Sequence, residues 1–252
     1  MISGASCWNQ SVQQGMSLVR AGDRDVYTFD AAAPTLYAQL AATAARTPDA
    51  VAIVDDWGHR TTFAQLKSYA DDLAGYLCAN ASVRAGDRVG LLMHADAEFA
   101  VAFYAISKAG CTCVPIPTKY REPEVASIAR AADLKALVMG EEFEPWRQSL
   151  PVRPSETVVA TNCEKGFGFP QAQGFAPVCE ACGGPDDVAI MMFTSGTTSG
   201  AKGVMLTNRN VVHATMVYQR LMGTTPDDRC LIPIPIYHVT GLIALLAQFV
   251  YV

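Results

Sequence analysis

The spacing of apolar positions predicts an alternation of helices and strands along most of the chain. After Arg60-Thr61-Thr62-Phe63, apolar residues recur at helical spacing, while shorter apolar runs bounded by turn residues are typical of strands. We expect strands near 51–54, 60–63, 89–93, 113–116, 136–139, 157–160, 188–193 and 203–206, and helices near 35–46, 66–77, 97–108, 122–132 and 209–221. This alternation predicts an α/β fold with a mostly parallel sheet flanked by helices on both faces.

The two ends of the chain lack this alternation. Residues 1–33 mix Ser, Gly and Gln without periodicity, so we expect an irregular lead-in. The last stretch, Leu242–Val252, is almost entirely apolar and is interrupted only by Gln248. It is too short to span a bilayer, so it is better interpreted as a buried helix.

Composition narrows the class of protein. Half of the residues are apolar, which is ample for a core, and the net charge of −5 argues against a nucleic-acid-binding surface. The N-terminus does not resemble a signal peptide, so we expect a cytoplasmic protein whose eight cysteines are reduced. Cys179 and Cys182 have zinc-knuckle spacing, but no second close pair follows, and we predict no metal site there.

One loop concentrates the chemistry. Between two strand-like runs lies the segment Thr194-Ser195-Gly196-Thr197-Thr198-Ser199-Gly200-Ala201-Lys202-Gly203. Glycines let the backbone approach a ligand closely, hydroxyls donate to phosphate oxygens, and a lysine adds a mobile positive charge. The loop therefore predicts a polyphosphate-binding site formed by Thr194, Ser195, Gly196, Thr197, Thr198 and Lys202.

Two other interpretations of the loop are weaker. A solvated Ser/Thr/Gly linker rarely lies between two apolar strands. A P-loop NTPase needs the pattern Gly-x-x-x-x-Gly-Lys-Ser/Thr. Counted from Gly196, the second glycine position holds Ala201, and Lys202 is followed by Gly203, so the match fails twice.

The loop resembles the phosphate loop of the adenylate-forming enzymes, which include acyl-CoA synthetases, aryl-CoA ligases, luciferases and peptide-synthetase adenylation domains. Their pattern is Thr/Ser-Ser-Gly-Thr/Ser-Thr-Gly-x-Pro-Lys-Gly. This chain departs from it at Ser199, where Gly is usual, and at Ala201, where Pro is usual. The lost proline costs the loop some rigidity.

Three further segments resemble the same family and follow its order. They are Arg60–Leu66, Lys108–Pro117 and Pro235–Gly241, the last similar to the Pro-x-Phe/Tyr-His-x-x-Gly segment of acyl- and aryl-CoA ligases. The first two are expected to be structural. A lone His beside Tyr237 is more often a core histidine than a ligand contact. The resemblance favours the second role and implies that His238 contacts the substrate or adenylate. With no acid after Arg229 to hold an ammonium group, an aliphatic or aromatic acid without an amine is favoured.

The resemblance implies an AMP-forming acyl-CoA synthetase. Such an enzyme joins a small-molecule carboxylic acid to MgATP, releases pyrophosphate, and passes the acyl group to coenzyme A or to a carrier protein. Thr194, Ser195, Thr197, Thr198 and Lys202 would hold the β- and γ-phosphates. ATP, Mg²⁺ and coenzyme A are thus the implied cofactors.

The resemblance also implies an incomplete enzyme. Residues 34–252 would be part of the N-terminal adenylation domain, with about 60–225 as one α/β subdomain and 34–59 and 226–252 as parts of a second. The C-terminal domain would be absent and the chain alone inactive. Without the later strands, the apolar end would be exposed and would favour self-association. A non-catalytic nucleotide-binding or partner module, and an adenylation domain that loads a carrier protein, are the alternatives.

Overall fold

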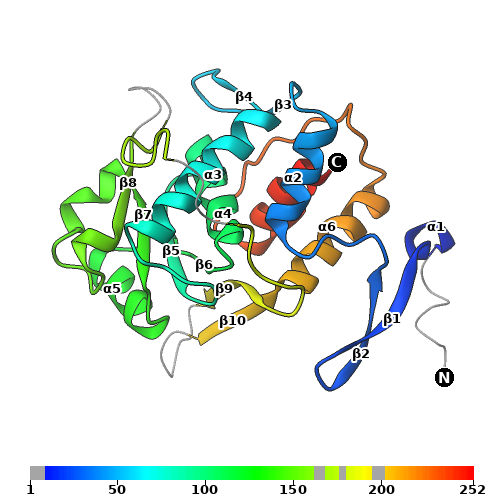
Figure 1. Ribbon diagram of the computed structural model, residues 1–252, viewed down its shortest axis with the longest axis horizontal. Helices are drawn as coiled ribbons and strands as arrows, with labels where there is room; N and C mark the ends of the chain where they lie inside the picture. Colours follow the sequence, from blue (N-terminus) through cyan, green and yellow to red (C-terminus); the bar gives the residue numbers. More distant parts are fainter. Residues whose placement is uncertain (1–8, 162–167, 176–179, 195–201) are drawn as a thin grey trace.

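A six-stranded sheet in the order β10-β9-β6-β5-β7-β8 forms the centre of the computed structural model, which describes residues 9–161, 168–175, 180–194 and 202–252 (Figure 1). Its strands are β5 (Arg88–Leu92), β6 (Thr112–Pro115), β7 (Ala136–Gly140), β8 (Thr157–Ala160), β9 (Val188–Thr194) and β10 (Lys202–Thr207). Neighbouring strands are parallel except for the antiparallel pair β9–β10. The predicted mostly parallel sheet is confirmed.

Helices cover both faces of this sheet. One face carries α3 (Phe63–Ala79), α4 (Ala97–Lys108) and α6 (Asn208–Met222), with α2 (Leu36–Arg46) packed on α3 and α4, and the other carries α5 (Glu122–Ala131). Successive side chains of a strand point to opposite faces of the sheet. Leu91 therefore packs in the core on the α3–α4 face, and Leu92 packs in the core on the α5 face. Helix α4 is apolar nearly all round because it lies between the sheet and other helices.

Side-chain caps start two of the predicted helices where the sequence places them. Thr62 and Gln65 form a capping box at α3, in which Thr62 N donates to Gln65 Oε1 at 2.9 Å and Gln65 N donates to Thr62 Oγ1 at 3.2 Å. Thr207 and Asn210 do the same at α6. The segment Arg60–Leu66 is thus a helix start, as expected, placed after the hairpin of β3 (Val51–Val54) and β4 (Arg60–Thr62).

The irregular lead-in predicted for residues 1–33 is wrong over most of its described length. After the short α1 (Gln10–Gln13), the strands β1 (Met16–Ala21) and β2 (Arg24–Phe29) pair as an antiparallel hairpin. Its sequence shows no periodicity because neither face of the hairpin is consistently buried. Figure 1 shows the hairpin beside the C-terminal half of the chain, near α6.

Phe29 anchors this hairpin to α6. Its ring is 2% exposed and stacks on the imidazole of His213 with a centroid distance of 5.1 Å. The guanidinium of Arg220 lies 4.2 Å from the ring centroid and donates to the carbonyl oxygens of Val12 and Gln14. Burial lowers the pKa of His213, which favours the neutral ring against Phe29.

We expect Phe29→Leu to loosen the hairpin, since it keeps apolar bulk but loses the ring stacking and the cation–π contact. The expected loss is about 1–2 kcal/mol in the opening free energy of residues 16–29, measured by amide hydrogen exchange. The matched control is Tyr27→Leu, because the Tyr27 side chain is 61% exposed. Equal exchange rates in the two variants would contradict the anchoring role.

The C-terminal segment is helical and buried, but the expected exposed apolar strip is wrong. A π-helix (Thr240–Ala247) runs into α7 (Gln248–Tyr251), and Leu242, Ile243 and Val250 are at most 2% exposed. The segment packs on α2 and α6, which come from distant parts of the sequence and together cover it. The apolar end therefore gives no reason for self-association. No helix among the described residues is long and apolar enough to cross a membrane.

A partly buried ion cluster joins α2, α3 and α4. The carboxylate of Asp71 accepts hydrogen bonds from Lys108 Nζ at 2.8 Å, Lys67 Nζ at 2.7 Å and Tyr37 Oη at 2.5 Å. Burial alone would raise the pKa of Asp71, but these hydrogen bonds outweigh it and hold the pKa below its ordinary value. Lys108 of the Lys-Ala-Gly segment is therefore structural, as expected.

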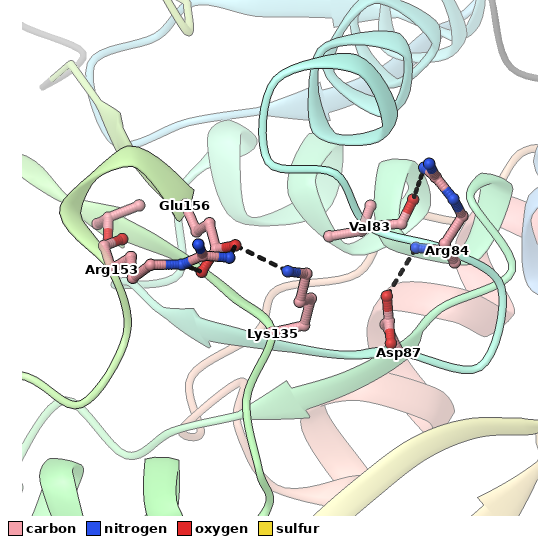
Figure 2. Close-up of polar contacts among 7 residues, drawn as sticks. Val83, Arg84, Asp87, Lys135, Arg153 and Glu156 are labelled. Carbon is pink, nitrogen blue, oxygen red and sulfur yellow. Dashed lines mark hydrogen bonds and ion pairs between the residues drawn. The ribbon is translucent and has the colours of Figure 1, made fainter.

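Ion pairs also hold the amino edge of the sheet, where β5, β7 and β8 begin. Figure 2 shows the carboxylate of Glu156 facing both Arg153 and Lys135, with Lys135 Nζ at 2.8 Å. Hydrogen bonding by Arg153 is the main reason that the pKa of Glu156 lies below its ordinary value. Nearby, Arg84 N donates to Asp87 Oδ2 at 2.7 Å and closes the turn into β5 (Figure 2). These contacts brace the edge opposite the predicted site.

Candidate phosphate-binding edge

The two strands that flank the predicted phosphate loop face each other at the carboxyl edge of the parallel strands. Strand β9 ends at Thr194 and β10 begins at Lys202, and these two residues are ladder partners. Strands β5, β6, β7 and β8 run parallel with β9 and end at the same edge. Open α/β sheets bind ligands beyond the carboxyl ends of their strands, so the position suits the predicted chemistry.

The two strands that carry the loop are held differently. Thr194 and Lys202 are the last partners of the β9–β10 ladder. Strand β9 is anchored to β6 through the pair Cys113–Ile190 and through Thr112 Oγ1, which donates to Val188 O at 2.8 Å. Strand β10 is the outer strand of the sheet, and Lys202 is exposed. Lys202 is thus exposed on β10, and the neighbouring strand β9 is anchored to β6.

Gly203 allows two side chains of β9 to lie across β10. Phe193 is its direct ladder partner, and a Cβ on Gly203 would lie 3.3 Å from Phe193 Cζ and 3.2 Å from Met191 Cγ. Such distances are tighter than ordinary van der Waals contact. The glycine that follows the lysine in the motif therefore has a packing role beside the loop.

The start of α6 is tied to the turn before β9. Asn208 N donates to Asp187 O at 2.9 Å, and Gly184 N donates to Asp187 Oδ2 at 2.7 Å. The guanidinium of Arg209 makes two 2.9 Å hydrogen bonds with Asp186 and thereby lowers the pKa of that carboxyl. These contacts tie the segment that enters β9 to the segment that leaves β10.

The structure places only some of the predicted site residues. Ser195, Gly196, Thr197 and Thr198 lie outside the described residues, as does Cys179 of the zinc-knuckle pair. Thr194 and Lys202 are brought together as ladder partners. Across the part of the chain that is described, no group of three or more His, Cys, Asp or Glu side chains could hold a metal.

His238 is exposed at the end of an extended segment, so it is not a core histidine. Its N–H donates to Pro235 O at 3.1 Å, its carbonyl accepts from Leu242 N at 2.9 Å, and its ring lies 4.8 Å from that of Tyr237. These contacts stay within its own turn and the helix start. The described residues show no hydrogen bond or ion pair from His238 to Lys202.

A second polar group on the carboxyl edge was missed from the sequence. His94 follows β5 and Glu142 follows β7, and their Nε2 and Oε1 atoms lie 3.6 Å apart. Between these two strands the order of the sheet reverses, which is where such folds commonly bind ligands. Burial raises the pKa of Asp96 in the same loop. The sequence signal that could have indicated this group is the position of both residues shortly after an apolar strand.

Comparisons with known proteins agree with this geometry. A family profile described as AMP-binding enzyme matches residues 40–251. The long-chain-fatty-acid–CoA ligase FadD13 of Mycobacterium tuberculosis is 33% identical over 187 residues, which cover 73% of this chain and 37% of that protein. The medium-chain fatty-acid–CoA ligase of Escherichia coli is 27% identical, with 80% of this chain and 38% of that protein covered.

Solved structures give the same result. ATP-bound MatB of Rhodopseudomonas palustris superposes with a TM-score of 0.76 at 26% identity, covering 86% of this chain and 43% of that chain. The N-terminal domain of FACL13 of Mycobacterium tuberculosis superposes with a TM-score of 0.71 at 28% identity, covering 87% of this chain and 56% of that chain.

The sheet, its covering helices and these structural neighbours define an α/β protein of the adenylate-forming class. The chain belongs to the AMP-binding enzyme family. It spans less than half the length of the curated CoA ligases named above.

Proposed function

We propose that this chain is the N-terminal part of an ATP-dependent acid–thiol ligase. The reaction converts a carboxylate and ATP into an acyl-adenylate and pyrophosphate. The thiol of coenzyme A then attacks the acyl carbon, the acyl–phosphate bond breaks, and AMP leaves as the thioester forms. The observation that carries the proposal is the segment Thr194–Gly203 of hydroxyls, glycines and one lysine, whose described ends, Thr194 and Lys202, are ladder partners at the carboxyl edge.

In this proposal the loop holds the leaving group. The ammonium of Lys202 and the hydroxyls of Thr194, Ser195, Thr197 and Thr198 bind the β- and γ-phosphates and orient pyrophosphate for departure. Charge placed where negative charge develops stabilises the transition state. Mg²⁺ would neutralise phosphate charge when bound, but the described residues form no set of ligands for it, so no step is assigned to the ion.

The acid would lie near His238, whose exposed ring is free to meet a ligand. No Asp or Glu occurs between Arg229 and Val252, so nothing in that stretch would pair with a substrate ammonium. Relatives named for long- and medium-chain fatty acids support an aliphatic acid, and one named for 2-succinylbenzoate supports an aromatic one.

Loading of a carrier protein is the second candidate. Part of the peptide synthetase FmoA3 superposes with a TM-score of 0.73 at 27% identity. The acceptor thiol separates the two candidates, because a ligase gives a coenzyme A thioester and a loading domain gives a thioester on the carrier protein.

Binding of MgATP to the 252-residue chain tests the phosphate-binding part of the proposal. If the loop holds the β- and γ-phosphates, inorganic pyrophosphate should displace ATP, while adenosine should compete poorly. Isothermal titration calorimetry with the three ligands measures this order. Failure of pyrophosphate to compete, or competition by adenosine at equal strength, would contradict the assignment of the loop.

A further inference from the structure

Gly241 lies at the start of the π-helix, with its Cα against the backbone of residues 235 and 236. A Cβ on Gly241 would lie 2.9 Å from Pro235 O and 3.1 Å from Ile236 Cα. Both are backbone atoms, so no side chain can rotate away to make room. Any side chain at this position would have to push the helix start and the preceding turn apart.

The carbonyl that Gly241 contacts also closes the turn that carries His238. Pro235 O accepts the N–H of His238 at 3.1 Å, and His238 O accepts the N–H of Leu242 at 2.9 Å. The turn and the first residues of the π-helix are therefore coupled through the backbone of His238. A displacement at Pro235 O reaches the histidine directly.

Neither side of this contact can move into the core. Ile236 is 4% exposed and holds the turn from inside, while Leu242 and Ile243 are 0% and 2% exposed and hold the helix. Between them, His238, Val239 and Thr240 are exposed. A separation forced at Gly241 must therefore be absorbed by the segment that presents the His238 ring.

We propose that Gly241 is a positioning residue that fixes the direction in which His238 is presented. The spacing Pro-x-x-His-x-x-Gly follows from this geometry: the proline carbonyl accepts the histidine N–H, and the glycine is the residue that rests on that carbonyl. The contact between Gly241 and Pro235 O does not depend on the proposed function, whereas the importance of that contact for catalysis rests on it. π-helical turns often occur beside functional sites, in agreement with this assignment.

Histidine NMR spectra of the full 252-residue chain test the inference. The chain has four histidines, and His238→Ala assigns the resonance of His238. In Gly241→Ala we expect the ring resonance of His238 to move while the other three stay in place. Gly184→Ala is the matched control, because the nearest atom to its Cβ would be Asp187 Oδ2 at 3.8 Å, and it should leave all four unchanged.

An unchanged His238 resonance in folded Gly241→Ala protein would overturn the inference. If that variant does not fold, Ile236→Ala provides the test, because it removes the inner anchor of the same turn and adds no atoms. It must then displace or broaden the His238 resonance, and an unchanged resonance would overturn the inference. MgATP binding is measured in parallel: its absence in the unsubstituted chain contradicts the proposed function but leaves the resonance test valid.

Discussion

Lys202→Ala is expected to weaken the binding of inorganic pyrophosphate to the chain by about 10- to 100-fold, since hydrogen bonds to charged groups contribute about 1.5–3 kcal/mol. Lys202 is exposed on the outer strand, where it pairs with Thr194 across the ladder. Its removal takes a charge from the loop without opening a cavity, so the free energy of unfolding should hardly change. Calorimetric titration with pyrophosphate and a parallel thermal melt measure both quantities.

Arg24→Ala is the control for a general loss of positive charge. Arg24 lies in the hairpin, and its side chain is 83% exposed beside an equally exposed Asp23. Such surface pairs contribute little, so this variant should bind pyrophosphate like the unsubstituted chain. Equal weakening in both variants would indicate a nonspecific charge effect, and unchanged affinity in Lys202→Ala would show that Lys202 does not bind the phosphates.

Most regular elements could be predicted because each has a local signal. The helix expected near 97–108 is α4 (Ala97–Lys108), and the helix expected from Arg209 is α6, which begins one residue earlier because Thr207 accepts the N–H of Asn210 as its N-cap. In the segment Arg60–Leu66, the amide oxygen of Gln65 accepts the N–H of Thr62 and closes the capping box. Where short-range physics determines an element, one sequence is sufficient.

Features set by distant contacts could not be predicted. The hairpin of β1 and β2 depends on Phe29 packing against His213, far along the chain. The cover on Leu242–Val252 comes from α2 and α6, so an apolar run that looked exposed is buried. The pairing of β10 outside β9 is likewise a property of the assembled sheet.

The candidate site was predictable in chemistry but not in geometry. The residue types of the loop indicate phosphate binding, yet only the sheet shows that Thr194 and Lys202 are ladder partners at the carboxyl edge. The role of Gly241 was equally hidden, because its contact with Pro235 O joins a turn to a π-helix that local propensity does not predict. His94 and Glu142 became neighbours only when β5 and β7 paired.

Lys108→Met is expected to lower the free energy of unfolding by about 3 kcal/mol, because removing one partner of a buried ion pair leaves the other incompletely compensated. The side chains of Lys108 and Asp71 are 7% and 14% exposed. Lys67→Met is the matched control, since it removes a second lysine from the same carboxylate but one that is 36% exposed, and it should cost about 1 kcal/mol or less. Urea unfolding at neutral pH measures both.

The pH dependence separates loss of the ion cluster from loss of packing. In the unsubstituted chain the pKa of Asp71 lies below its ordinary value of 3.8. Its contribution to stability is therefore complete above that value and is lost as the pH falls toward the lower folded-state pKa. In Lys108→Met, burial remains while one hydrogen-bond donor is gone, so the pKa of Asp71 should rise toward or above its ordinary value. The loss of stability on acidification, which comes from the gap between the unfolded and the lower folded-state pKa, should therefore be smaller than in the unsubstituted chain. Unfolding free energies measured across the acid range show this directly. Parallel curves for Lys108→Met and the unsubstituted chain would mean that Lys108 stabilises the fold through packing of its methylene groups and not through Asp71.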